Sequence, residues 1–125
     1  MDIVFTEREL DVMGVLWERG PSTVAEVRDV LADDLAYNTV LTVLRVLEEK
    51  GHIAHEEEGR AHRYRALVDR EAAGSSAVRR MVRKLFRGSP ELLMTQLVSD
   101  RSIPEDSLRR MRELLEAHLG TEEEK

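Results

Sequence analysis

The sequence predicts a mainly α-helical fold that includes one small β-hairpin. Three observations support this prediction. Apolar residues recur at helical spacing in three segments before Gly51, which is typical of amphipathic helices. Two short runs then surround a glycine-containing tip between His52 and Leu67, which indicates a hairpin. Helical spacing returns after Asp69 in three further segments.

The first two helices are predicted from the residues that start them. Thr6 and Glu9 have the spacing of a capping box, and so do Thr23 and Glu26. Such boxes satisfy the free backbone N–H groups at a helix start. Gly20 and the proline after it end the first helix. The expected apolar stripes are Leu10, Met13, Leu16 and Trp17 in the first helix, and Val24, Val27 and Leu31 in the second.

The third helix is predicted from about Ala36 to Lys50. Its buried face is expected to hold Tyr37, Val40, Leu41, Leu44 and Leu47. Its opposite face is polar and holds Asn38, Thr42, Arg45 and Glu49, with Thr39 at the edge. Two short helices, a third with a polar face and a hairpin make up a winged helix-turn-helix, whose third helix fits the major groove of DNA.

The C-terminal helices carry long apolar stripes. Asp69 is expected to cap a helix that runs to Arg87. The next helix is expected to begin at Ser89-Pro90 and the last at Pro104. The end of the last helix is expected to fray from Gly120. One small domain cannot cover these stripes alone. We therefore predict that a second copy packs on them. The expected dimerisation residues are Leu85, Leu93, Leu97, Leu108, Met111 and Leu115.

These patterns divide the chain into two regions. Residues 1–68 are predicted to form a DNA-binding winged helix-turn-helix domain, and residues 69–125 a helical dimerisation domain. A two-fold dimer would bind a palindromic DNA site, because the symmetry of the site mirrors that of the protein.

Seven residues are predicted to contact DNA. In the third helix, arginine can pair with guanine, asparagine with adenine, and the threonine methyl can pack on thymine. The alternative is an ordinary solvated helix face. In the hairpin, a basic cluster can clamp phosphates. The predicted DNA-binding residues are Asn38, Thr39, Thr42, Arg45, Arg60, His62 and Arg63.

Charge argues against DNA binding at first sight. The net charge is −6, whereas a basic footprint is usual for DNA-binding proteins. Residues 1–68 hold 8 Lys or Arg and 14 Asp or Glu, and therefore carry the whole deficit. A local basic patch resolves the conflict, because salt screens the repulsion between DNA and acidic residues that lie more than about 8–10 Å from the contact. Arg60, Arg63 and Arg65 form such a patch, although they could instead pair with Glu56, Glu57 and Glu58 across the hairpin.

The chain resembles the penicillinase and methicillin-resistance repressor family. The similarity rests on Tyr37-Asn-Thr-Val-Leu-Thr-Val-Leu-Arg45, on Leu47-Glu-Glu-Lys-Gly51 and on Gly59-Arg-Ala-His-Arg-Tyr64, together with Glu9-Leu-Asp-Val-Met-Gly-Val-Leu-Trp17. The resemblance implies a dimeric repressor that binds a palindromic operator, with antibiotic-resistance or stress genes as its targets. It also implies a partner in some members, namely a membrane-bound sensor that triggers cleavage within the C-terminal helices.

Three departures from the family pattern limit what carries over. Val46 stands where members often have a second basic residue. The chain has no cysteine, which excludes the copper–thiolate switch of some members. The Asn-Phe cleavage point of the best-known members aligns with Gln96-Leu97. Cleavage by a sensor protease is therefore a doubtful expectation here.

Other functions receive little support from the sequence. An enzyme is not expected, since no phosphate loop, nucleophile elbow or zinc-protease motif occurs. No cofactor and no metal is expected either, because His52, His55, His62 and His118 lack a ligand spacing. No signal peptide or membrane span is predicted, which indicates a cytoplasmic protein. The basic stripe from Arg79 to Arg87 is expected to be a solvated face, or to contact a partner chain or flanking DNA.

Two alternative functions remain open. One is a small-molecule-sensing winged-helix regulator of the multiple-antibiotic-resistance type, although such chains usually have an extra helix before the first one found here. The other is a winged-helix module that binds protein rather than DNA, which the acidic residues 1–68 favour. The strong salt dependence of phosphate contacts would separate DNA binding from protein binding.

Overall fold

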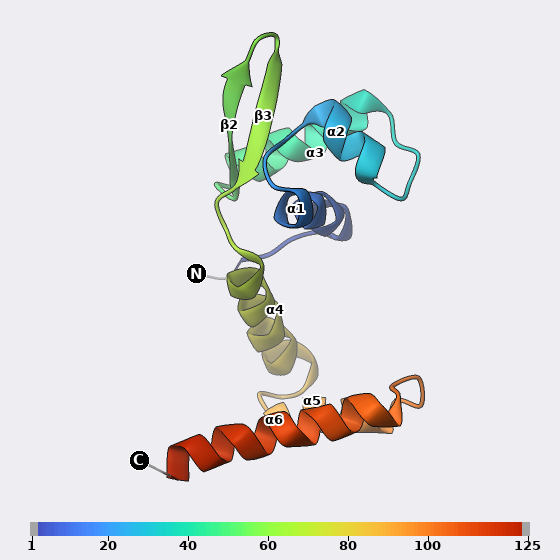
Figure 1. Ribbon diagram of the computed structural model, residues 1–125, viewed down its shortest axis with the longest axis vertical. Coiled ribbons are helices and arrows are strands. Elements are labelled where there is room, and N and C mark those ends of the chain that lie inside the picture. Colours follow the sequence, from blue (N-terminus) through green and yellow to red (C-terminus); the bar gives the residue numbers. More distant parts are fainter. Residues whose placement is uncertain (1–2, 124–125) are drawn as a thin grey trace. The chain divides into compact units, whose positions relative to one another are not determined.

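The structure is a computed structural model that describes the backbone of residues 3–123 and the side chains of residues 3–120. Six helices and three short strands follow one another within these described residues (Figure 1). They are α1 (Glu7–Arg19), β1 (Ser22–Thr23), α2 (Val24–Val30), α3 (Tyr37–Glu49), β2 (Ile53–Glu58), β3 (Ala61–Ala66), α4 (Arg70–Leu85), α5 (Pro90–Ser99) and α6 (Glu105–Glu123). None of the described helices is both long and apolar enough to cross a membrane. The order of elements is that of a winged helix-turn-helix followed by three helices.

Local sequence sets the helix starts. Both predicted capping boxes are present, with the Thr6 side chain accepting from the Glu9 amide and the Thr23 side chain from the Glu26 amide. Asp69 accepts a 2.7 Å hydrogen bond from the Ala72 amide at the start of α4. Ser89 caps α5 just before a proline in its first turn. These caps confirm the predicted helix starts. The starts could be predicted because each cap depends on residues only three positions apart.

The sheet is antiparallel, with the strand order β1-β3-β2. β2 and β3 form the predicted hairpin, or wing, with Ile53 opposite Ala66 and Glu58 opposite Ala61. The two-residue strand β1 was not predicted from the sequence. It lies in the connection between α1 and α2 and pairs with β3, which fastens the wing to that connection.

The core lies among α1, α2, α3 and the sheet. Its residues are Val12, Met13, Val15, Leu16, Val24, Val27, Val40, Leu44, Leu47, Ile53 and Tyr64. Two residues expected in this core, Leu10 and Tyr37, are instead exposed, each with an exposed fraction of 46%. Leu31 lies just beyond α2 and is only partly buried against the core.

Two helix ends differ from the prediction. α4 ends at Leu85 rather than Arg87, because Arg87 adopts a left-handed conformation with φ 53°. α6 continues through Gly120 to Glu123, where fraying was expected. Gly120 therefore does not end the last helix.

The chain divides into two compact units, Met1–Arg79 and Arg80–Lys125. The first part of α4 belongs to the N-terminal unit. There the Ile3 amide donates a 2.8 Å hydrogen bond to the Ser76 side chain, and the Trp17 indole N–H donates a 2.8 Å bond to the Val68 carbonyl. The Arg70 guanidinium lies 5.6 Å from the Trp17 ring centre. α1 therefore anchors the start of α4.

Candidate nucleic-acid interface

The exposed face of α3 carries the predicted base-reading residues. Asn38, Thr39, Thr42 and Arg45 are all exposed, while Val40, Leu44 and Leu47 on the opposite face are fully buried. The Thr42 hydroxyl donates a 2.9 Å hydrogen bond to the Asn38 carbonyl. Arg45 makes no hydrogen bond or ion pair with any residue whose side chain the structure describes. α3 therefore presents a polar face with an available guanidinium, held in place by core packing.

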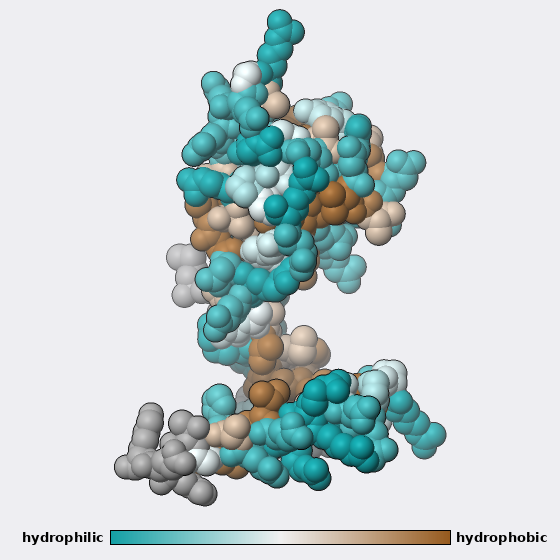
Figure 2. All heavy atoms as spheres, in the orientation of Figure 1, coloured by the Kyte–Doolittle hydropathy of each residue, from teal (hydrophilic) through white to brown (hydrophobic). Residues whose placement is uncertain are grey.

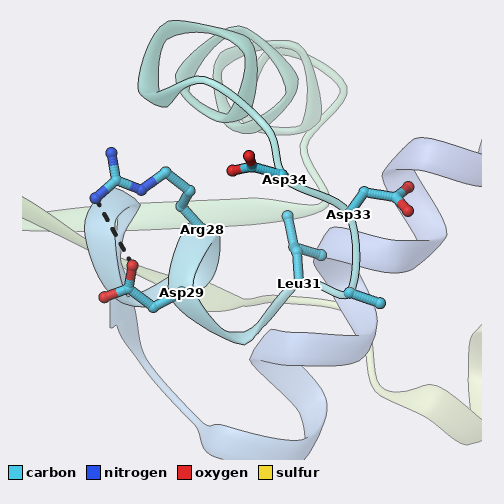
Figure 3. A pocket seen from close by; sticks show the side chains of 6 residues that line it. Arg28, Asp29, Leu31, Asp33 and Asp34 are labelled. Carbon is cyan, nitrogen blue, oxygen red and sulfur yellow. Dashed lines mark ion pairs between the residues drawn. The ribbon is translucent and has the colours of Figure 1, made fainter.

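The approach to α3 is acidic on one side. The end of α2 and the turn after it line an open hollow of about 310 Å³, whose residues are Arg28, Asp29, Leu31, Ala32, Asp33 and Asp34 (Figure 3). In this hollow Arg28 and Asp29 form an ion pair. These carboxylates help to explain the acidic balance of the N-terminal unit, and they lie on α2 and in the turn after it rather than on the wing.

The tip of the wing carries an available arginine. Gly59 takes a left-handed conformation there, with φ +62°, which a glycine adopts without steric cost. Arg60 follows it at the exposed end of the hairpin. Among the described side chains, neither Arg60 nor Arg65 has an ion-pair partner. Both guanidinium groups can therefore contact a phosphate.

Arg63 is partly exposed and is held by contacts with other residues of the N-terminal unit. Its guanidinium pairs with Glu58, lies 2.9 Å from the carboxylate of Glu26 and donates a 3.1 Å hydrogen bond to the Pro21 carbonyl. The hydrogen bond to Glu58 is the main cause that raises the pKa of Arg63. Arg63 thus fastens the wing to the start of α2. Its partner Glu26 is 37 residues away, which a reading of local spacing cannot detect.

A polar cluster joins the last turns of α3 to the wing; we refer to Glu48, His55 and His62 as the seam cluster. The Nδ1 atom of His55 lies 2.6 Å from a carboxylate oxygen of Glu48. The His55 and His62 rings stack with centres 4.2 Å apart and planes 10° apart. Sequence reasoning found His62 but missed Glu48 and His55, because their contact depends on the register of the hairpin.

Tyr64 lies beneath the seam cluster and is only 2% exposed. Burial is the main cause that raises the pKa of its hydroxyl, and the charge of Glu48 adds to the rise. The charge of Arg45 opposes it. Glu48 and Arg45 of α3 thus both influence the hydroxyl of a buried wing tyrosine.

Comparisons with known proteins agree with this geometry. The family model described as penicillinase repressor matches residues 5–117. The chain is 36% identical over 117 residues to the "Transcriptional regulator BlaI" of Mycobacterium tuberculosis, covering 90% of this chain and 85% of the relative. Among solved structures, a MarR family protein from Bacillus stearothermophilus has the same fold, with a TM-score of 0.51 and 19% identity over 98% of this chain and 78% of the other. The chain belongs to the penicillinase repressor family, whose members regulate transcription as DNA-binding winged-helix proteins and are not enzymes.

Proposed function

We propose that the protein is a homodimeric repressor that acts in the cytoplasm and binds a palindromic operator, with antibiotic-resistance or stress genes as its targets. The observation that carries the DNA contact is the exposed face of α3 beside the wing. Asn38, Thr39, Thr42 and Arg45 are proposed to enter the major groove, while Arg60 and His62 approach the phosphate backbone. Arg63 is proposed to hold the wing in place and to reach a phosphate only at the cost of its internal ion pairs.

Burial in the C-terminal unit supports the dimer. Between Arg80 and Gly120 no described side chain is fully buried. Figure 2 shows apolar side chains at the surface of this unit beside charged ones. Of the six predicted dimerisation residues, Leu85, Leu97 and Leu115 are 72%, 37% and 49% exposed, and Leu93, Leu108 and Met111 are half-buried. A second copy is proposed to cover them, since a unit without a closed core gains stability from a partner chain.

Proteolytic induction is not part of this proposal. Gln96 and Leu97 lie inside α5, which runs from Pro90 to Ser99. A helical peptide bond must first unfold locally before a protease can bind it in an extended form. Cleavage at Gln96-Leu97 would therefore require local unfolding of α5.

The substitution Arg45→Ala tests the DNA contact. If Arg45 reads a base, we expect operator binding to weaken by about 1–3 kcal/mol while binding to a random duplex changes little. Fluorescence anisotropy with both duplexes at fixed salt measures the difference, and Glu49→Ala on the same helix serves as the matched control. Equal affinity of Arg45→Ala and the parent for both duplexes would remove Arg45 from the readout.

A further inference from the structure

The seam cluster connects the base-reading helix to the DNA-facing side of the wing. Glu48 comes from the last turns of α3, His55 from β2 and His62 from β3. In the hairpin His55 is opposite Tyr64 and His62 is opposite Glu57, so the two histidines lie diagonally on one face of the sheet. Their stacked rings, with centres 4.2 Å apart, make the contact direct.

The contact with Glu48 fixes the orientation of the His55 ring. Both carboxylate oxygens of Glu48 lie close to its Nδ1, at 2.6 and 2.9 Å, so this nitrogen must carry the proton and donate it. The side chains of His55 and Glu48 are 30% and 32% exposed, and both can exchange protons with solvent.

The charged groups around the cluster come from all three elements that pack there. α3 contributes the anion Glu48 and the cation Arg45, and β2 contributes the anion Glu57 opposite His62. β3 contributes Tyr64, whose raised pKa leaves it neutral at ordinary pH. Histidine is the side chain that gains its charge between pH 5 and 8. A proton taken up by the histidine pair would therefore add a positive charge on the face of the wing that the proposed function turns toward DNA phosphates.

Resting on the function proposed above, we propose that the seam cluster is a pH-responsive positioning device for DNA binding, in which Glu48 orients His55, His55 supports His62 by stacking, and His62 contacts a phosphate in its protonated form. DNA binding then takes up protons, and affinity rises as the pH falls. His62 is the contacting residue, whereas Glu48 and His55 act through it.

The test measures the affinity of the full-length protein for an operator and a random duplex from pH 8.0 to pH 5.5 at constant ionic strength. Affinity is expected to rise about three- to tenfold over this range, since one pKa unit gained on binding corresponds to a factor of ten. The rise should appear with both duplexes, because phosphate contacts carry no sequence information. His62→Gln should lose the rise, so that its affinity at pH 5.5 stays close to its own affinity at pH 8.0.

Two further variants separate positioning from general effects. Glu48→Gln keeps an acceptor for His55 but removes the charge, so the rise should move to lower pH even if overall affinity changes. His118→Gln, on the exposed face of α6, should keep the parent profile. Histidine NMR signals with and without DNA should show His62 taking up a proton in the complex.

The possible failures are distinguishable. A protein that binds no duplex at any pH would refute the proposed function itself. Binding that is independent of pH, or a His62→Gln variant that keeps the parent profile, would refute the device while leaving the repressor assignment intact. Circular dichroism confirms that each variant is folded.

Discussion

The two units of the molecule differ in how completely they bury their apolar side chains. In the N-terminal unit, Val12, Met13, Val27 and Leu44 are fully buried and form one core with the sheet. In the C-terminal unit, Leu85 and Leu114 are 72% and 68% exposed. The first unit has a core of its own, whereas the second presents an apolar surface. In the repressor proposed above, DNA contact and chain assembly would therefore depend on separate parts of the sequence.

The largest expected effect comes from charges placed in the exposed apolar surface of the C-terminal unit. The double substitution Leu85→Asp and Leu115→Asp should produce a monomer. Operator affinity should then fall by about 10²–10⁴-fold, because two linked binding modules lose their high effective concentration. Sedimentation velocity and anisotropy measure the two effects. A variant that remains dimeric would show that the copies meet elsewhere.

A substitution in the closed core should act on stability instead of assembly. Leu44→Ala is expected to lower the free energy of unfolding by about 2–5 kcal/mol, since it deletes buried methyl groups and leaves a cavity. The loss should not depend on protein concentration, in contrast to substitutions at a dimer surface. Urea unfolding followed by circular dichroism provides the measurement, with Leu10→Ala at an exposed site as the control. A concentration-dependent loss would contradict the separation of the two units.

A smaller effect on stability is expected at Glu9, whose ion pair with Lys50 joins α1 to the end of α3. Glu9 is 3% exposed, and its carboxylate lies 2.8 Å from the Lys50 ammonium at the end of α3. Burial alone would raise the pKa of Glu9, but the Lys50 hydrogen bond and the Thr6 amide outweigh it and lower the pKa. Glu9→Gln keeps an acceptor for the Thr6 amide but loses the charge paired with Lys50, and should cost about 1–2 kcal/mol of stability at pH 7, the order expected for a weakened charge-assisted hydrogen bond.

The pH dependence of this loss follows from the direction of the shift. A carboxyl group with a lowered pKa in the folded state stabilises the fold above its unfolded pKa of about 4.3. That contribution disappears as the pH falls through the lower, folded value. Urea unfolding at pH 7, 5 and 3.5 should therefore show the parent and Glu9→Gln converging only below about pH 4. A constant difference at all three pH values would show that the charge of Glu9 does not matter.

The smallest expected effect compares two basic regions, the wing tip and the stripe on α4. Arg60→Ala should reduce the slope of log affinity against log salt by about one unit, as expected for one lost phosphate contact, with the fold unchanged. Arg79, whose guanidinium donates a 2.8 Å hydrogen bond to the Ser75 hydroxyl, is the matched control. A slope lowered by Arg79→Ala but not by Arg60→Ala would assign the phosphate contacts to α4 and not to the wing.

Local features of the fold were predictable from the sequence, and long-range ones were not. Capping boxes at Thr6 and Thr23 depend on neighbouring residues, and both were found. The exposure of Leu10 was missed because the buried face of α1 includes Val12 and Val15, so it is rotated relative to the face that was predicted. The strand β1 at Ser22 was missed because two residues are too few to show the alternation of apolar and polar side chains that identifies a strand.

The same distinction applies to the candidate site. The polar face around Thr42 and Arg45 follows from helical spacing, and the structure places these side chains on the exposed face of α3. The role of Arg63 could not be read in this way, since its partner Glu26 lies on another element. The contact between His55 and Glu48 likewise requires the hairpin to fold back on α3.

The indole of Trp17 gives the molecule a built-in optical probe. It is the single tryptophan of the sequence. Its N–H bonds the Val68 carbonyl, and Arg70 lies over its ring. Loss of that hydrogen bond or departure of that cation would change the polarity around the ring and hence its emission spectrum. Intrinsic fluorescence can therefore follow the attachment of α4 to α1 in the unmodified protein, without a dye.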